Sequence, residues 1–185
     1  DVGCGNGHFL NLMNNNFNNK NLYGFDMSLT SVRSAKLIKK NNSNKINIFK
    51  ADASNINKWK KKIKIKNKKV IFFFWFLLHE ISKNKKSIIT NYLKDIKKNF
   101  PNSKIVICEL TKQKDVILRD NCEKSLMPEY LLFHDFSGQG VLSYTDYKEV
   151  LINTGYTLKK EWKFDQSSAN NDQNSEPSTF VWILE

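Results

Sequence analysis

Short apolar runs alternate with longer amphipathic stretches through the first two thirds of the chain. This pattern is typical of βα units and a parallel sheet. The runs with the length and composition of strands cover residues 21–25, 46–50, 69–74 and 104–108. Helices are predicted over residues 28–40 and 83–99, where apolar residues recur at helical spacing and Pro101 follows the second stretch.

The last third of the chain predicts one more helix and a pair of strands. The segment TDYKEVLINTG, from Thr145, predicts a capped helix closed by Gly155, since Gly tolerates the left-handed backbone beyond a helix end. Strands are predicted over 156–164 and 179–184, around the polar loop DQSSANNDQNSEP. We therefore expect one α/β domain over residues 1–185, with a mostly parallel sheet and a C-terminal antiparallel hairpin.

Composition is that of a soluble protein in a reducing compartment. The most hydrophobic run, residues 70–78 (VIFFFWFLL), has the length of a strand and is too short to cross a bilayer. The cysteines, Cys4, Cys108 and Cys122, are too scattered for a disulfide framework or a zinc site. We therefore expect a cytoplasmic protein without a membrane partner or a metal.

The formal net charge of +12 suggests a nucleic-acid partner at first sight. Of the 30 basic residues, however, only Arg33 and Arg119 are arginines. Proteins that read bases and phosphates depend on the planar fork of Arg, so the lysine excess is better explained by AT-rich codon usage on solvated faces. The block at residues 58–69 (KWKKKIKIKNKK) remains the one candidate footprint for RNA.

A glycine-rich motif opens the chain. In DVGCGNGHFL, Gly3, Gly5 and Gly7 alternate with other residues directly after Asp1 and Val2. Glycines that lead from a strand into a helix let a ligand approach the backbone, where the amides of the helix N-terminus point at it. The third glycine comes one residue earlier than in the dinucleotide fingerprint G-x-G-x-x-G, so the motif predicts a different nucleotide-type ligand.

Two further acids follow predicted strands. Asp26 comes after the strand in LYGFDMS, and Asp52 after the strand in FKADASN. The carboxyl ends of parallel strands meet at one edge of a sheet, where ligands bind. Each acid alone also has a local interpretation, because Asp26 precedes a possible N-cap at Ser28 and Asp52 could form an Asx turn.

With an acid before G-x-G-x-G and these two later acids, the chain resembles the class I S-adenosylmethionine-dependent methyltransferases over nearly its whole length. The resemblance implies a Rossmann-like, doubly wound sheet with strand order 3-2-1-4-5-7-6 and S-adenosyl-L-methionine as cofactor. It implies that Asp26 holds the ribose hydroxyls and that Asp52 lies beside the adenine amino group. The residues that it assigns to the cofactor are Asp1, Gly3, Cys4, Gly5, Gly7, Asp26, Met27, Asp52, Ala53 and Phe76.

The same resemblance suggests that the sequence is a fragment. Only Asp1 and Val2 represent the central strand one. Without that strand, its two neighbours would leave buried ladder groups unpaired. We therefore expect a longer protein whose preceding segment completes this strand and carries a helix over the cofactor.

The segment after the fourth strand, FFWFLLHEI, holds the best candidate for a catalytic base. A hydroxyl acceptor must lose a proton, and a histidine such as His79 is suited to accept it, because the ordinary pKa of histidine lies near neutral pH. The resemblance puts His79 at the methyl end of the donor. A structural histidine is the alternative interpretation, and the adjacent Glu80 could cap a helix or orient the ring.

Absent motifs narrow the acceptor. The (D/N)PP(Y/F) segment of enzymes that methylate adenine or glutamine amines does not occur, and we find no clustered acids for a metal-dependent catechol type. The segment MPEYLLFHDFSGQG is similar to the acceptor-side segment of small-molecule methyltransferases, with His134 and Asp135 as a second base pair. A core helix with a Gly-rich turn is the other interpretation of this segment.

These observations predict methyl transfer to a small-molecule acceptor, at oxygen. The alternatives are an RNA methyltransferase that uses the lysine block at residues 58–69, and a domain that binds the nucleoside without chemistry. The sequence leaves the oligomeric state open.

Overall fold

The computed structural model describes residues 1–17, 21–42, 46–63, 69–83, 85–112, 127–164 and 177–185. These residues form two compact units, Asp1–Trp75 and Phe76–Glu185. Each unit combines helices with strands, so the α/β class is confirmed within each. The single domain over residues 1–185 stays a prediction.

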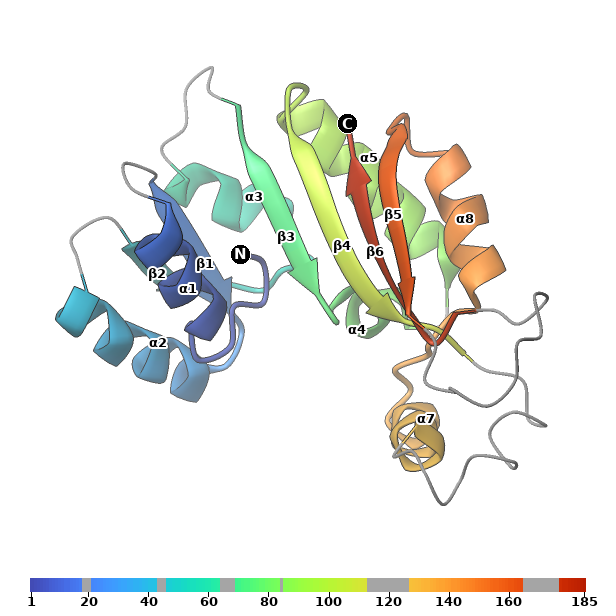
Figure 1. The fold of residues 1–185 in the computed structure, drawn as a ribbon, viewed down its shortest axis with the longest axis horizontal. Coiled ribbons are helices and arrows are strands. Elements are labelled where there is room, and N and C mark those ends of the chain that lie inside the picture. The colour runs from blue at the N-terminus through green and yellow to red at the C-terminus, as the bar shows by residue number, and fades with distance from the viewer. Residues whose placement is uncertain (18–20, 43–45, 64–68, 84, 113–126, 165–176) are drawn as a thin grey trace. The chain divides into compact units, whose positions relative to one another are not determined.

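Unit 1 is built around the opening residues of the chain. Its elements are α1 (His8–Asn16), β1 (Leu22–Asp26), α2 (Leu29–Asn42), β2 (Ile46–Lys50), α3 (Ile56–Trp59), the 3-10 helix η1 (Lys60–Lys62) and β3 (Ile71–Trp75). Strands β1 and β2 pair in parallel, with Leu22 opposite Ile46 (Figure 1). Val2 forms parallel bridges with Phe25 of β1 and Phe74 of β3. The order of neighbouring segments in unit 1 is therefore β2, β1, Val2, β3. The seven-strand order across the whole chain stays a prediction.

The contact between α1 and β1 depends on Gly24. A Cβ atom at Gly24 would lie 2.2 Å from Leu10 Cδ1 and 3.1 Å from Cys4 Cβ. Leu10 and Cys4 are buried together with Ile46 in one apolar cluster. The helix can therefore approach the strand only because position 24 carries no side chain.

Gly24→Ala is expected to lower the free energy of unfolding by about 1–3 kcal/mol, because the added methyl group overpacks this cluster. Urea unfolding of the parent and the variant measures the loss. In the Gly24→Ala background, Leu10→Ala should cost less than in the parent, since it removes the atom that clashes. An equal cost of Leu10→Ala in both backgrounds would contradict the described packing.

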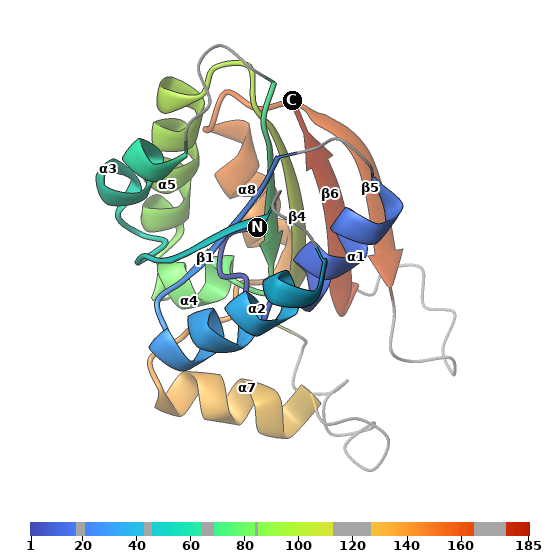
Figure 2. The same cartoon turned by 90° about the vertical axis from the view of Figure 1, so that its left-hand side faces the viewer.

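Unit 2 carries the C-terminal antiparallel strands. Its elements are α4 (Leu78–Ser82), α5 (Lys86–Asn99), β4 (Lys104–Leu110), α7 (Met127–Phe136), α8 (Tyr144–Ile152), β5 (Leu158–Phe164) and β6 (Thr179–Leu184). Strand β6 pairs in antiparallel fashion with both β4 and β5, which confirms the predicted C-terminal pair. Helices α5 and α8 lie on the same face of these strands (Figure 2).

Aromatic side chains join α8 to that face. Phe180 and Trp182 are two residues apart in β6, so both side chains point to the same side of the sheet. The ring of Phe180 lies 5.7 Å from that of Tyr144 and 5.2 Å from that of Tyr147. Both β6 residues are almost completely buried, so α8 covers the core of unit 2.

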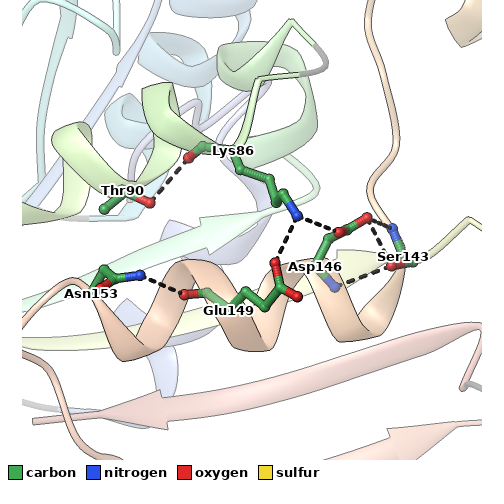
Figure 3. Close-up of polar contacts among 6 residues, drawn as sticks. All are labelled: Lys86, Thr90, Ser143, Asp146, Glu149 and Asn153. Carbon is green, nitrogen blue, oxygen red and sulfur yellow. Dashed lines mark hydrogen bonds and ion pairs between the residues drawn. The ribbon is translucent and has the colours of Figure 1, made fainter.

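Ion pairs fasten α8 to the start of α5 (Figure 3). Lys86 Nζ lies 2.8 Å from Asp146 Oδ1 and 2.7 Å from Glu149 Oε2. Asp146 also closes a capping box with Ser143, the N-cap of α8. The hydrogen bond from Lys86 lowers the pKa of Asp146, despite some burial of the carboxylate. Because these groups are largely exposed, the ion pairs orient the helices more than they stabilise them.

The structure corrects three predicted helix boundaries. Helix α8 ends at Ile152 with Asn153 as its C-cap, so Gly155, with a φ of 78°, lies one residue beyond the predicted C′ position. Helix α8 is capped by Ser143, upstream of the predicted start at Thr145, since only Ser143 can pair with Asp146 in a capping box. The helix predicted to start at residue 83 begins at Lys86, because Lys83 has a left-handed φ of 45° and ends the separate helix α4.

Several sequence predictions lie outside the described residues. They concern residues 18–20 of the asparagine-rich stretch, residues 64–68 of the lysine block, Cys122, and residues 165–176 of the polar loop. Among the described helices, none is long and apolar enough to cross a membrane.

Candidate active site

The opening glycines adopt the left-handed backbone that favours glycine. Gly3, Gly5 and Gly7 have φ angles of 70°, 51° and 83°. A Cβ atom at Gly5 would meet nothing within 4 Å, whereas one at Gly7 would lie 2.9 Å from the Cβ of Ala35 in α2. Gly7 is therefore required for helix packing, and Gly5 presents a bare backbone to open space, as a ligand cradle requires.

Asp26 is tied to the glycine motif. Its Oδ2 accepts the N–H of Gly5 at 2.9 Å, and its Oδ1 accepts the N–H of Ser28 at 2.7 Å. Ser28 Oγ accepts the N–H of Ser31 at 3.2 Å, so the local capping interpretation also holds. Each carboxylate oxygen keeps further acceptor capacity, so Asp26 is fixed in position and can still accept hydrogen bonds from hydroxyl groups.

The residues around Asp52 form a local turn. Asp52 Oδ1 accepts the N–H of Ser54 at 2.9 Å and its hydroxyl at 2.7 Å, which is the Asx-turn interpretation of the sequence. The carbonyl of Ala53 accepts the indole N–H of Trp59 at 3.0 Å. Met27, which follows Asp26, is 68% exposed. The turn fixes Asp52, and its role toward adenine stays a prediction.

Asp1 and Cys4 differ in what they offer a ligand. Asp1 Oδ1 is buried without a hydrogen-bond partner among the described residues. Such an acceptor is rare in folded proteins and suits a donor supplied by a ligand. The Cys4 side chain instead lies in the apolar cluster with Leu10 and Ile46, and burial raises the pKa of its thiol to about 11. Only the backbone of Cys4 is therefore suited to a ligand contact.

A buried acid–imidazole pair lies in unit 2. His79 in α4 and Glu109 in β4 are 1% and 0% exposed, and His79 Nδ1 lies 2.8 Å from Glu109 Oε2. The other carboxylate oxygen, Oε1, accepts the N–H of Leu78 at 2.5 Å. Glu109 therefore fixes both the first turn of α4 and the orientation of the imidazole ring.

The surroundings of His79 favour its protonated form. Burial disfavours the imidazolium, but the hydrogen bond and charge of Glu109, with the charge of Glu80, outweigh it and raise the pKa of His79 above its ordinary value. In the neutral ring, Nδ1–H donates to Glu109 and Nε2 carries the lone pair, a tautomer assigned from these contacts. The pair can therefore take up a proton at Nε2.

Helix α7 adds two aromatic side chains to this pair. Tyr130 Oη lies 3.2 Å from His79 Nε2, and the ring centroids of Tyr130 and His134 lie 3.9 Å apart. His134 is 6% exposed, and its ring lies 5.0 Å from that of His79. Its Nδ1–H donates to the Tyr130 carbonyl at 2.7 Å. The structure thus brings both sequence-predicted bases, His79 and His134, into one cluster.

Sequence reasoning missed Glu109, and it placed Tyr130 only in the acceptor-side segment, without a contact to His79. Glu80, the acid that it considered for orienting the imidazole, is exposed, and Glu109 makes that hydrogen bond instead. The sequence did contain a signal for Glu109, which is the single acid in the apolar run KIVICEL. A carboxylate is seldom buried in a strand without a partner, so this acid indicates a buried partner. The side chain of Asp135, the predicted partner of His134, lies outside the described part of the chain.

Phe76 begins unit 2 with an unusual backbone. Its φ is 51°, its side chain is 43% exposed, and its N–H donates to the carbonyl of Cys108 at 2.8 Å. A left-handed aromatic residue is an outlier, and such strain clusters at functional sites. This observation is in line with the predicted role of the segment after β3.

The lysine block makes local contacts where it is described. Lys62 Nζ lies 3.3 Å from the carbonyl oxygen of Lys50 and 5.1 Å from the ring centroid of Phe49. Lys58 and Lys61 are exposed. These contacts neither require nor indicate a nucleic acid.

The chain matches a protein-family model and a set of solved structures. The family model described as "Methyltransferase domain" matches residues 1–170. No curated protein sequence matches the chain. Solved structures do match, with identities low enough to show only a shared fold.

Three examples, each of which aligns with the whole chain, are as follows. The SAM-dependent methyltransferase from Anabaena variabilis is 16% identical with a TM-score of 0.66, and 75% of its chain is covered. The plantazolicin methyltransferase BamL, in complex with a triazolic desmethylPZN analog and SAH, is 18% identical with a TM-score of 0.64 and 74% covered. The methyltransferase domain of bacterial CtHen1-C is 13% identical with a TM-score of 0.62 and 86% covered.

The family match extends over most of the 185 residues and includes the glycine motif, Asp26, His79 and Glu109. The chain therefore belongs to the methyltransferase domain family and is an S-adenosylmethionine-dependent methyltransferase.

Proposed function

We propose that this enzyme methylates a hydroxyl oxygen of a small-molecule acceptor, with His79 as the general base. The observation that carries the proposal is the buried pair of His79 and Glu109, 2.8 Å apart. A neutral amine can attack a methyl group with its own lone pair, whereas an unactivated hydroxyl must also lose its proton. A buried imidazole that is oriented by a carboxylate can accept this proton.

The residues of the glycine motif fit a nucleoside donor. Gly5 leaves open space beside its backbone, Asp26 keeps acceptor capacity next to it, and Asp1 Oδ1 is a buried acceptor without a partner among the described residues. We assign these residues to S-adenosylmethionine, with further contacts from Gly3, Gly7, Met27, Asp52, Ala53, Phe76 and the backbone of Cys4. The proposed sheet has the family order 3-2-1-4-5-7-6.

In this proposal the protein aligns the reactants and manages one proton. Bound S-adenosylmethionine supplies an electrophilic methyl group on a sulfonium. The acceptor O–H bond breaks as the oxygen bonds to the methyl carbon, the C–S electron pair stays on sulfur, and the proton passes to His79 Nε2. Glu109 holds the imidazole in place and stabilises the imidazolium that forms.

A small-molecule acceptor is supported by the lysine contacts, which are local, and by the aromatic cluster on α7. A structure of similar fold holds a desmethylPZN analog, in line with this class of acceptor. The acceptor is identified by screening hydroxyl, carboxyl and amine compounds for release of S-adenosylhomocysteine. Turnover is expected with hydroxyl compounds, and turnover confined to amines would contradict the proposal.

Asp26→Asn is expected to weaken S-adenosylmethionine binding by about 1.5–3 kcal/mol, the scale of a hydrogen bond to a charged group. The amide keeps one acceptor oxygen but loses the charge and the second acceptor. Isothermal titration calorimetry measures the change, with Asp95→Asn on the exposed side of α5 as the matched control. An Asp26→Asn variant that binds as tightly as the control would remove Asp26 from the ribose role.

A further inference from the structure

His79, the base of the proposed reaction, is almost completely buried. His79 is 1% exposed, so an acceptor cannot touch its ring directly. The group in contact with His79 Nε2 is the hydroxyl of Tyr130, at 3.2 Å. Tyr130 is half-buried, so part of its side chain is open to its surroundings while the base is not.

We infer that Tyr130 relays the proton from the acceptor to His79. This inference rests on the proposed function and adds a catalytic residue to it. As the acceptor oxygen bonds to the methyl carbon, its O–H bond breaks and its proton passes to Tyr130 Oη. The proton that Tyr130 held passes to His79 Nε2, so the tyrosine ends the step neutral and His79 ends it as an imidazolium beside Glu109.

The contacts of α7 hold Tyr130 in a relay position. Its ring lies against that of His134, with centroids 3.9 Å apart, and its carbonyl accepts the Nδ1–H of His134 at 2.7 Å. Ser82 Oγ lies 2.8 Å from the carbonyl oxygen of His79 and 3.2 Å from that of Gly140. The turn that follows α7 is thereby attached to α4, which carries the base.

The acidity of Tyr130 agrees with a concerted relay. Burial, followed by the charges of Glu109 and Glu80, raises the pKa of Tyr130 to about 12. A free tyrosinate is therefore unfavourable at neutral pH, and the hydroxyl can give up its proton only as it receives another.

The first test measures access to His79 and needs no acceptor. Diethyl pyrocarbonate acylates accessible neutral imidazoles at pH 8. Peptide mass spectrometry then measures the rate of acylation of each histidine separately. Because His8 is exposed, it is the internal reference. His79 should react at least about tenfold more slowly than His8 in the parent, and Tyr130→Ala should raise the His79 rate at least about tenfold. Equal rates for His79 and His8 in the parent, or protection that persists in Tyr130→Ala, would overturn the relay.

The second test removes only the hydroxyl. Tyr130→Phe keeps the ring against His134 and should lower kcat about 100-fold with the hydroxyl acceptor found by the screen. Tyr156→Phe is the matched control, because it also removes only a tyrosine hydroxyl, here one that lies 2.9 Å from Ser103 Oγ, and it should keep the parental kcat. Adding Tyr130→Phe to His79→Ala should cause no further loss, because both residues act on one proton.

The two proposals fail in different ways. Parental turnover in His79→Ala would show that His79 is not the base, and it would contradict the proposed function. Slow turnover in His79→Ala together with parental turnover in Tyr130→Phe would overturn the relay alone.

Discussion

His79→Ala is expected to lower kcat by a factor of about 100–10,000 and to leave the affinity for S-adenosylmethionine nearly unchanged. The imidazole is the proton acceptor of the proposed reaction, whereas the donor is assigned to residues of the glycine motif. Release of S-adenosylhomocysteine at saturating acceptor measures kcat, and calorimetry measures donor affinity.

The neighbouring Glu80→Gln provides the control for His79→Ala. Glu80 is exposed, and the imidazole of His79 donates its Nδ1–H to Glu109 rather than to Glu80. We expect Glu80→Gln to keep kcat within a factor of about three of the parent, as usual for an exposed side chain. Parental turnover in His79→Ala would show that the histidine is structural.

The second large effect concerns stability. Glu109→Ala is expected to lower the free energy of unfolding by about 3–5 kcal/mol, the usual loss when one partner of a buried pair is removed. The change deprives the Leu78 N–H and the His79 Nδ1–H of their common acceptor. Urea unfolding measures the loss, and Glu109→Gln should lose less because its amide oxygen can still accept one of these hydrogen bonds.

The loss should also depend on pH. Because folding raises the pKa of His79, this group stabilises the folded state below its unfolded pKa of about 6.5 and loses that contribution as pH rises through the folded pKa. The deficit of Glu109→Ala should therefore be larger at pH 6 than at pH 9. An equal deficit at both pH values would show that the pair does not stabilise the imidazolium.

Local sequence patterns predicted most of the fold. Strands β2 and β6 have the predicted bounds, and the other predicted strands lie within two residues of those observed. Boundaries failed where one backbone angle or one side-chain pair decided them, as at Lys83 and at the cap on Ser143. Gly24 gave no sign of its role, because the need for a glycine there arises from Leu10 on the neighbouring helix.

The residues of the candidate site also differ in whether the sequence could predict them. The glycine motif and Asp26 were predictable, because their function depends on residue type at short spacing after a strand. Glu109 and Tyr130 were not, since they contact His79 from 30 and 51 residues away in the sequence. Cys4 matched the motif, yet its side chain belongs to the core, because the apolar surface of α1 faces it.

The pH dependence of kcat/KM in the parent and in Glu109→Gln tests most directly whether His79, oriented by Glu109, is the base. In the parent, kcat/KM should rise through an apparent pKa above the ordinary value of histidine, since Glu109 raises the pKa of His79 and only the neutral imidazole accepts a proton. In Glu109→Gln the step should move to lower pH, because burial then acts on the imidazole without a carboxylate to offset it. A step at the same pH in both proteins, or a flat profile in the parent, would contradict the assignment of His79 and Glu109 as the catalytic pair.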